Sequence, residues 1–219
     1  MEGFVVDHVS KTYIDEAQRP FQVLHEVSFS WSAGENIAIL GESGSGKSTL
    51  ARLMIGLERP SEGRILINGV DTTKWGLREW RKYRGKIQAV FQDAGGTLNP
   101  SWSTSKNVEE ALVNLTDLSP SQRKNRIAEL MEQTGLSKNL LDTPVRRLSG
   151  GEQRRLALLR SLSISPEFLI LDEVTAGLDL ISTEAVLQLL EKYEQEHDCA
   201  YLVVTHDLQI ASRLCEVIY

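Results

Sequence analysis

Continuous apolar runs recur along the chain and predict strands that are buried on both faces. They lie at residues 37–40 (IAIL), 168–171 (FLIL) and 200–204 (AYLVV). Runs of this kind are typical of the central strands of a parallel sheet, which helices cover on both sides. Shorter β-rich runs at residues 4–6 and 27–29, and the stretch from Gly63 to Gly69, alternate with turns and predict an antiparallel sheet beside the parallel one. The pattern therefore predicts an α/β fold.

Helical signals dominate residues 105–164. Residues 119–122 (SPSQ) form a capping-box start with Pro at the first helical position, and Gly135 marks the end of that helix. The apolar residues that share one face between these two signals are Ile127, Leu130 and Met131. We therefore expect a helical subdomain at about residues 93–164.

Composition and charge narrow the functional class. The chain has 219 residues, of which 41% are hydrophobic and 25% charged, which suits one large α/β domain. A net charge of −6 argues against a general binder of nucleic acid or anionic membranes. No apolar run approaches the ~20 residues that span a bilayer. Two cysteines supply neither a disulfide framework nor the four thiolates of an iron–sulfur cluster. We expect a cytosolic protein.

Residues 41–49 (GESGSGKST) fit the phosphate-loop pattern G-x-x-x-x-G-K-[ST] at every fixed position. The loop follows the strand at 37–40 and precedes a predicted helix at 50–57, which is the context that a phosphate site needs. Lys47 is expected to reach the β- and γ-phosphates, and the Ser48 hydroxyl to ligate Mg²⁺. The residues predicted to contact the nucleotide here are Gly41, Ser43, Gly44, Ser45, Gly46, Lys47, Ser48 and Thr49.

The strand at 168–171 ends in two acids, Asp172 and Glu173. A carboxylate at the end of a buried strand lies beside the phosphates, so Asp172 is expected to hold Mg²⁺ directly or through water. Glu173 is expected to orient and deprotonate an attacking water. Strands often end in acids at a solvated edge, and this interpretation therefore depends on the phosphate loop that precedes it.

Residues 148–155 (LSGGEQRR) begin a helix with Ser149 as the predicted N-cap. Two glycines behind a serine, before a helix, form a second anion-binding N-terminus. One nucleotide needs only one such loop, so we expect Ser149, Gly150 and Gly151 to cap the γ-phosphate of an ATP molecule held by a second copy. At this motif the sequence resembles the ATP-binding subunits of ABC transporters, whose signature is LSGGQ or LSGGE. The resemblance covers nearly the whole chain.

Four further motifs occur in the order of that family. The resemblance implies that Gln92, in residues 90–93 (VFQD), is the Q-loop glutamine, which contacts Mg²⁺ and the attacking water and senses the transporter. It implies that His206 contacts the γ-phosphate beside the base Glu173. It also identifies the D-loop, residues 174–179 (VTAGLD), with Asp179 at the nucleotide interface. Tyr13 matches the aromatic residue that stacks on adenine, and simple packing within the sheet is the alternative for it.

The resemblance thus implies a catalytic set of Lys47, Gln92, Glu173 and His206, and a Mg²⁺ set of Ser48, Gln92 and Asp172. One departure from the family lies in the D-loop, where Val174 replaces the usual proline. The fixed φ of proline is lost, and we expect a looser D-loop with no catalytic group missing.

Residues 90–93 followed by 97–101 (TLNPS) resemble the peptide/nickel importer branch, which carries VFQDP…SLNP after the Q-loop. Ala94 replaces the usual Pro, and Gly95 and Gly96 replace more polar positions. In the family this segment receives the coupling helix of the transmembrane subunit. The alternatives are an amino-acid importer, a lipoprotein extruder, a phosphonate-type system, or a plain solvent loop.

The resemblance implies a P-loop NTPase of ABC type with a single domain over 1–219. Residues 1–92 and 165–219 would form the parallel-sheet nucleotide core with its antiparallel β-subdomain, and 93–164 the helical subdomain. Two chains, identical or paralogous, would close head-to-tail around two ATP molecules. The other implied partners are permease subunits and an extracytoplasmic solute-binding protein, with no nucleic acid. The chain would be peripheral on the cytoplasmic face of the membrane.

The rival function is a soluble ABC ATPase that acts on ribosomes or DNA. Members of those classes usually carry two nucleotide domains in one chain or a long coiled coil between the motifs. This chain has one phosphate loop and a short segment between Gln92 and Leu148, so we expect transport. A regulator without turnover is disfavoured because Glu173 and His206 are both present. Family members continue beyond a strand like the one at 214–219, and we expect the natural chain to do so too.

Overall fold

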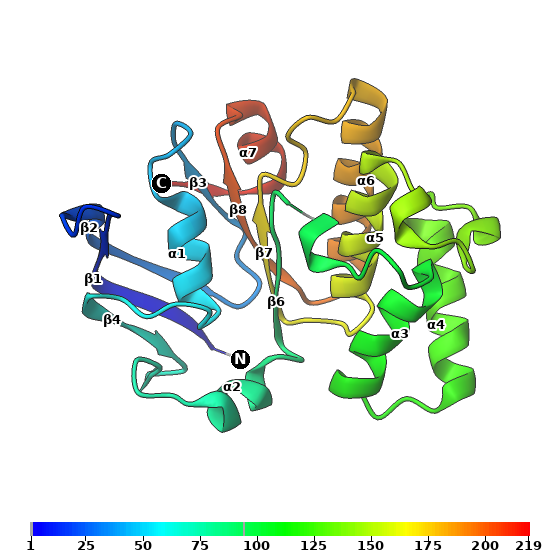
Figure 1. Ribbon diagram of the computed structural model, residues 1–219, viewed down its shortest axis with the longest axis horizontal. Helices are drawn as coiled ribbons and strands as arrows, with labels where there is room; N and C mark the ends of the chain where they lie inside the picture. The colour runs from blue at the N-terminus through cyan, green and yellow to red at the C-terminus, as the bar shows by residue number, and fades with distance from the viewer. Residues whose placement is uncertain (1, 94) are drawn as a thin grey trace.

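A computed structural model of the chain, described over residues 2–93 and 95–219, contains two sheets (Figure 1). The first is antiparallel, with the strand order β2-β1-β4-β5. Its strands are β1 (Gly3–Ile14), β2 (Pro20–Ser32), β4 (Glu62–Ile67) and β5 (Val70–Asp71). The antiparallel sheet predicted from the short β-rich runs is therefore present, and it includes all three of those runs.

The second sheet is parallel and has the order β6-β7-β8-β3-β9. Its strands are β3 (Ile37–Leu40), β6 (Ile87–Val90), β7 (Phe168–Asp172), β8 (Ala200–Thr205) and β9 (Val217–Ile218). Every residue of β7 and β8 is buried, as the continuous apolar runs predicted. Helix α6 (Leu180–Glu196) connects β7 to β8, and α7 (Leu208–Leu214) follows β8.

Helix α1 (Lys47–Met54) follows β3 and lies three residues earlier than the predicted helix at 50–57. The difference arises at its N-cap, Gly46, which has a left-handed backbone with φ 93°. Glycine adopts this conformation without steric cost, so the helix can begin directly at the lysine of the phosphate loop. Apolar periodicity starts later, at Leu50, because the first turn of the helix is polar.

Residues 95–164 are largely helical, and α3, α4 and α5 lie together on one side of the molecule (Figure 1). The helices are α2 (Leu77–Tyr83), before this region, and α3 (Thr104–Leu115), α4 (Pro120–Gln133) and α5 (Gly150–Leu162) within it. Short 3₁₀ turns occupy Gly95–Thr97, Lys138–Leu140 and Val145–Arg147. The predicted start of α4 is present, because Ser119 and Gln122 form the capping box and Pro120 is the first helical residue.

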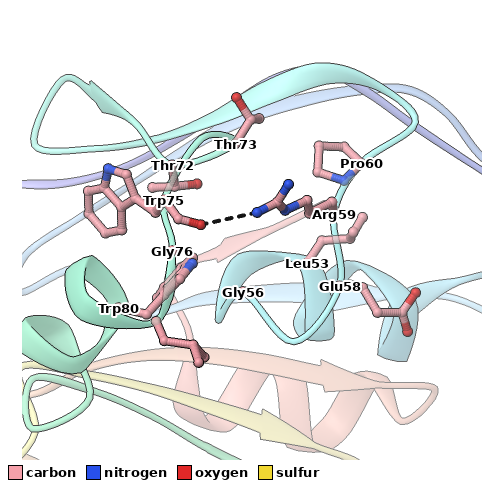
Figure 2. A pocket seen from close by; sticks show the side chains of 11 residues that line it. Leu53, Gly56, Glu58, Arg59, Pro60, Thr72, Thr73, Trp75, Gly76 and Trp80 are labelled. Carbon is pink, nitrogen blue, oxygen red and sulfur yellow. Dashed lines mark hydrogen bonds between the residues drawn. The ribbon is translucent and has the colours of Figure 1, made fainter.

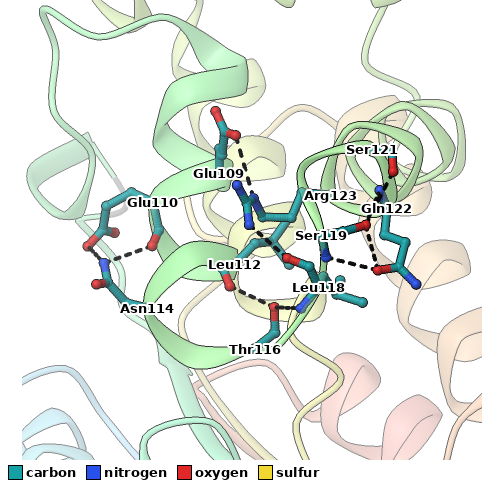
Figure 3. A network of polar contacts seen from close by, with 10 residues as sticks. All are labelled: Glu109, Glu110, Leu112, Asn114, Thr116, Leu118, Ser119, Ser121, Gln122 and Arg123. Atoms are coloured by element: carbon teal, nitrogen blue, oxygen red, sulfur yellow. Dashed lines mark hydrogen bonds and ion pairs between the residues drawn. The ribbon is translucent and has the colours of Figure 1, made fainter.

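Polar contacts fix the turn between α3 and α4 (Figure 3). The Arg123 guanidinium donates to the backbone oxygen of Leu118 at 2.7 Å and lies 3.6 Å from the Glu109 carboxylate on α3. On the other side of the turn, Ser119 donates its backbone N–H to Gln122 at 2.8 Å. The three apolar residues predicted to share one face of α4 are all buried.

Strand β7 separates two hydrophobic clusters, because alternate side chains of a strand point to opposite faces. Leu169 and Leu171 belong to the cluster that contains the inner faces of α3 to α6. Phe168 and Ile170 belong to the cluster that joins the two sheets and α1. Trp31 of β2 is fully buried there and packs edge-on against Phe168, with ring centroids 4.7 Å apart. Among the described residues, no helix is long and apolar enough to cross a membrane.

Candidate functional site

Several predicted site residues meet in one cavity of about 250 Å³ at the carboxyl edge of the parallel sheet. Loops that follow β3, β6, β7 and β8 all reach this edge, since the carboxyl ends of parallel strands lie on the same side of a sheet. The lining residues are Val23, Ser43, Gly44, Gly46, Lys47, Ser48, Thr49, Gln92, Glu173, Ala176 and His206. The site predicted from separate motifs is thus brought together by the order of the strands.

The phosphate loop depends on glycine at two positions. Gly44 has φ 84°, and Gly46 has φ 93° with its Cα hydrogen facing β2. A Cβ at Gly46 would lie 2.8 Å from Leu24 and 2.9 Å from Val23, so no other residue fits there without movement. Lys47 is 8% exposed, and its ammonium donates at 2.7 Å to the backbone oxygens of Gly41 and Glu42. It is held inside the loop, where an anion would meet it.

Asp172, the last residue of β7, is buried, and one of its carboxylate oxygens has no hydrogen-bond partner. Its side chain is 1% exposed, and Oδ1 has no hydrogen-bond partner. Burial raises the pKa of this carboxyl above its usual value, and a hydrogen bond with Ser48 opposes that rise. A buried carboxylate oxygen without a donor, next to a serine hydroxyl, has the oxygen donor set that Mg²⁺ prefers. These residues therefore fit a divalent cation.

Glu173 and His206 both line the cavity and contact each other. The Nδ1 atom of His206 lies 2.9 Å from Oε1 and 3.1 Å from Oε2 of Glu173. The carboxylate is 12% exposed and the imidazole 62%. Glu173 has φ 51°, in the left-handed region that a residue with a side chain rarely adopts, and its backbone N–H donates to Val204 at 2.9 Å. Such backbone strain is typical of functional sites.

Tyr13 lies outside the set of residues that line the cavity. Its ring stacks on Phe21, with centroids 5.8 Å apart, and its hydroxyl donates to Glu58. Burial raises the pKa of Tyr13, and a side-chain hydrogen bond with Thr49, which lines the cavity, opposes that rise. The tyrosine is therefore next to the phosphate loop, and it also has the sheet packing that its alternative interpretation predicts.

The signature residues also lie away from the cavity, at the N-terminus of α5. Ser149 is the N-cap, as predicted, and forms a capping box with Glu152, to which it donates its N–H at 2.8 Å. Asp179 caps α6 instead of lining the cavity, and it accepts the N–H of Ser182 at 2.9 Å. Gly41 and Ser45 belong to the phosphate loop without lining the cavity. None of these residues lines the cavity of its own chain.

Sequence reasoning missed two residues that line the cavity, Val23 and Ala176. Neither carries a polar group. Ala176 lies within the predicted D-loop, residues 174–179, whose motif does not single it out as a contact residue, and Val23 belongs to no predicted motif. Gly95 and Gly96 of the branch-specific segment form a 3₁₀ turn after the Q-loop. The replacement of proline by Ala94 lies outside the described residues.

A separate pocket of about 200 Å³ lies between the end of α1 and the start of α2 (Figure 2). Trp75 and Trp80 line it, with ring centroids 5.2 Å apart, and Arg59 donates to the backbone oxygen of Trp75 at 3.3 Å. The Trp80 ring packs directly on Gly56, where a Cβ would lie 2.0 Å from the indole. None of the predicted site residues lines this pocket.

Comparison with known proteins identifies the family to which this chain belongs. Residues 24–176 match the ABC transporter family. The nickel import ATP-binding protein NikE of Brucella suis biovar 1 (strain 1330) is 40% identical over 191 residues, which cover 87% of this chain and 72% of that protein. NikE of Escherichia coli (strain K12) is 39% identical over 194 residues, which cover 89% and 72%. These relatives agree with the branch predicted from residues 90–93 and 97–101.

Solved structures agree with the fold. The dimeric post-hydrolysis state of the ATP-binding cassette MJ0796, bound to ADP and Pi, has a TM-score of 0.87 and 31% identity, covering 96% of this chain and 90% of that one. The structure of cbiO1 from Clostridium perfringens, part of the ABC transporter complex cbiONQ, has a TM-score of 0.81 and 30% identity, covering 100% and 85%. The predicted α/β fold of ABC type is confirmed, and this chain belongs to the ABC transporter family.

Proposed function

We propose that this chain is the ATP-hydrolysing subunit of an ABC transporter, with one ABC ATPase domain over residues 1–219. The observation that carries the proposal is the single cavity in which the phosphate loop, Gln92, Glu173 and His206 converge. One cavity thus combines a cradle for phosphates with a carboxylate and an imidazole that face it. This combination suits hydrolysis of a terminal phosphate, beyond mere binding of a nucleotide.

The phosphate loop would bind the nucleotide through its backbone N–H groups, and the Lys47 ammonium would neutralise the β- and γ-phosphates. Ser48, Gln92 and Asp172 would hold Mg²⁺, and the partnerless Oδ1 of Asp172 supports that assignment. When bound, Mg²⁺ would supply positive charge that offsets the negative charge of the phosphates. Tyr13, next to the loop, would supply the stacking surface for adenine.

Glu173 would accept a proton from the water that attacks the γ-phosphate. Its carboxylate is positioned for this by two contacts, the His206 imidazole at 2.9 Å and the backbone bond from Glu173 to Val204. The imidazole is largely exposed and lines the cavity, and since both nitrogens of a protonated imidazole donate, that form of His206 would also donate to a phosphate oxygen through Nε2. The residues Lys47, Gln92, Glu173 and His206 would therefore form the catalytic set.

Hydrolysis would need a second chain. Ser149, Gly150 and Gly151 begin α5 outside the chain's own cavity, with backbone N–H groups and a helix N-terminus suited to an anion. A head-to-tail dimer would place them, with Asp179, at the γ-phosphate of the partner, and the MJ0796 cassette is a dimer. Permease subunits would hold this dimer on the cytoplasmic face of the membrane, and a solute-binding protein would deliver cargo.

The cargo class follows from the relatives. Proteins named for nickel import are 39–40% identical to this chain over most of its length. We propose import of nickel, metal-chelate-like solutes or peptides. Loss of cellular nickel uptake on deletion of the gene would support the metal, whereas unchanged nickel uptake with loss of peptide uptake would assign peptides.

The hydrolytic role is tested by phosphate release from ATP in the presence of Mg²⁺. Glu173→Gln keeps the size of the side chain but removes the base, so turnover should fall by a factor on the order of 10² or more. ATP binding should survive, because the phosphate loop is unchanged. Glu132→Gln is the matched control, since its carboxylate is 75% exposed and distant in sequence from every motif. Wild-type turnover by Glu173→Gln would refute the assignment of the base.

A further inference from the structure

Arg154 of helix α5 forms hydrogen bonds with two loops that carry residues of the proposed mechanism. It lies on α5, five residues after the N-cap Ser149. One terminal nitrogen, Nη1, donates to the backbone oxygens of Val174, at 3.3 Å, and Ala176. The other, Nη2, donates to the backbone oxygen of Gln92 at 3.0 Å. A single guanidinium therefore bridges the signature helix, the Q-loop and the segment after Glu173.

The charge of Arg154 is used entirely on backbone oxygens. Among the described residues, no carboxylate forms an ion pair with it. Burial lowers the pKa of the guanidinium, yet arginine stays protonated in proteins. Hydrogen bonds from a charged donor are about twice as strong as neutral ones, and the planar fork of arginine can serve two loops at once. Lysine, with one compact ammonium, cannot span both.

The two loops that Arg154 joins are neighbours because β6 and β7 pair in the sheet. Gln92 follows β6, and Val174 follows Glu173 at the end of β7. The left-handed backbone of Glu173, at φ 51°, is held on one side by its bond to Val204. On the other side, the carbonyls that follow it are held by Arg154. The direction of the Glu173 carboxylate thus depends on contacts at both ends of this turn.

We propose that Arg154 is a positioning residue for ATP hydrolysis, which fixes the Q-loop and the Glu173 turn against the helix that carries the signature. The inference rests on the proposed function, because it acts through Glu173 and Gln92. It has a structural consequence as well. Helix α5 would reach the partner's nucleotide with its N-terminus, while Arg154, about one turn further on, holds the catalytic loops of its own chain. One helix would then touch both sites of a dimer.

The test compares kcat for ATP and the dissociation constant for a non-hydrolysable ATP analogue in four variants. Arg154→Gln should lower kcat at least about tenfold while the dissociation constant stays within about threefold, because no phosphate-binding group is altered. Arg154→Lys should fall between wild type and Arg154→Gln. Arg147→Gln makes the same change of charge at an exposed position just before the signature and should match wild type. Glu173→Gln reports on the proposed function itself.

The outcomes separate the two ideas. A kcat within twofold of wild type in Arg154→Gln, beside a Glu173→Gln variant without turnover, overturns the role of Arg154 and leaves the proposed function intact. Equal losses of kcat and of nucleotide affinity also overturn it, because they indicate a general structural role. If Arg154→Gln does not fold, Arg154→Lys decides, since wild-type kcat there excludes a bridge that needs the fork. Wild-type turnover in Glu173→Gln overturns both.

Discussion

The buried carboxylate of Asp172 destabilises the folded protein when it is ionised. Its replacement by Asn should therefore stabilise the fold and weaken the binding of Mg²⁺ with ATP. The side chain is 1% exposed and Oδ1 accepts no hydrogen bond. Leaving a buried polar group unsatisfied costs about 1–3 kcal/mol, and a charged one costs more. Asn keeps the shape and removes the charge. We expect Asp172→Asn to raise the free energy of unfolding at neutral pH by about 1.4 kcal/mol for each pH unit that separates the raised pKa of Asp172 from its ordinary value.

The pH dependence of this gain has a definite sign. The pKa of Asp172 in the folded protein is raised above its ordinary value of 3.8, chiefly by burial. Between the two values the folded state binds the proton and the unfolded state has lost it, so wild-type stability falls as the pH rises through this window. Asn does not titrate. The advantage of Asp172→Asn should thus be absent below 3.8, grow as the pH rises, and level off above the raised pKa.

Chemical denaturation across a pH series from 3.5 to 8 measures this difference. Glu173→Gln is the matched control, because it makes the same acid-to-amide change in a carboxylate that already faces His206 at 2.9 Å. It should bring no comparable gain. Mg²⁺ and ATP together should stabilise the wild type by about 2.7 kcal/mol at a hundredfold excess over the dissociation constant, and Asp172→Asn by clearly less. An Asp172→Asn variant no more stable than wild type at pH 7.5 would refute the reasoning.

Three further predictions concern the dimer, the binding of the adenine ring and the stability of the fold. In a Glu173→Gln background, ATP but not ADP should produce a dimer in light scattering at high protein concentration, and Ser149→Arg should abolish it; a dimer that persists contradicts the head-to-tail arrangement. Tyr13→Ala should weaken ATP binding by roughly 1–2 kcal/mol and Tyr13→Phe should not, whereas equal affinities in a titration would leave sheet packing as its role. Gly135→Ala, at φ 64° in open space, should cost about 1 kcal/mol in denaturation, and Gly56→Ala, at φ 69° against an indole ring, about 1–3 kcal/mol more; equal losses would contradict the packing argument.

Much of the fold could be read from local signals. Continuous apolar runs identified β3, β7 and β8, because strands covered on both faces have no polar side to reveal. The capping signal at Ser119 located α4 to the residue, since side-chain caps depend only on neighbours in sequence. The α/β fold followed from the apolar runs, the family and its nickel-related branch were predicted from the resemblance of the motifs, and the comparisons confirm all three.

Features set by backbone geometry could not be read in this way. Periodicity placed α1 three residues late, because the helix begins where Gly46 turns left-handed. The positive φ of Glu173 carries no signal at all, since glutamate favours other conformations. The sequence also gives no indication of the bridge made by Arg154, because its three acceptors are backbone oxygens, which every residue possesses.

The features that destabilise this fold lie together at one edge of the parallel sheet. The partnerless oxygen of Asp172, the left-handed turn at Glu173 and the buried ammonium of Lys47 all lie at the carboxyl end of the parallel strands. Strands β7 and β8 next to them are wholly buried and can offset such costs. A site for a metal ion and phosphates must keep charges out of water before the ligand arrives. Substitutions that relieve these costs should therefore stabilise the protein and weaken its chemistry together, since both effects have the same physical origin.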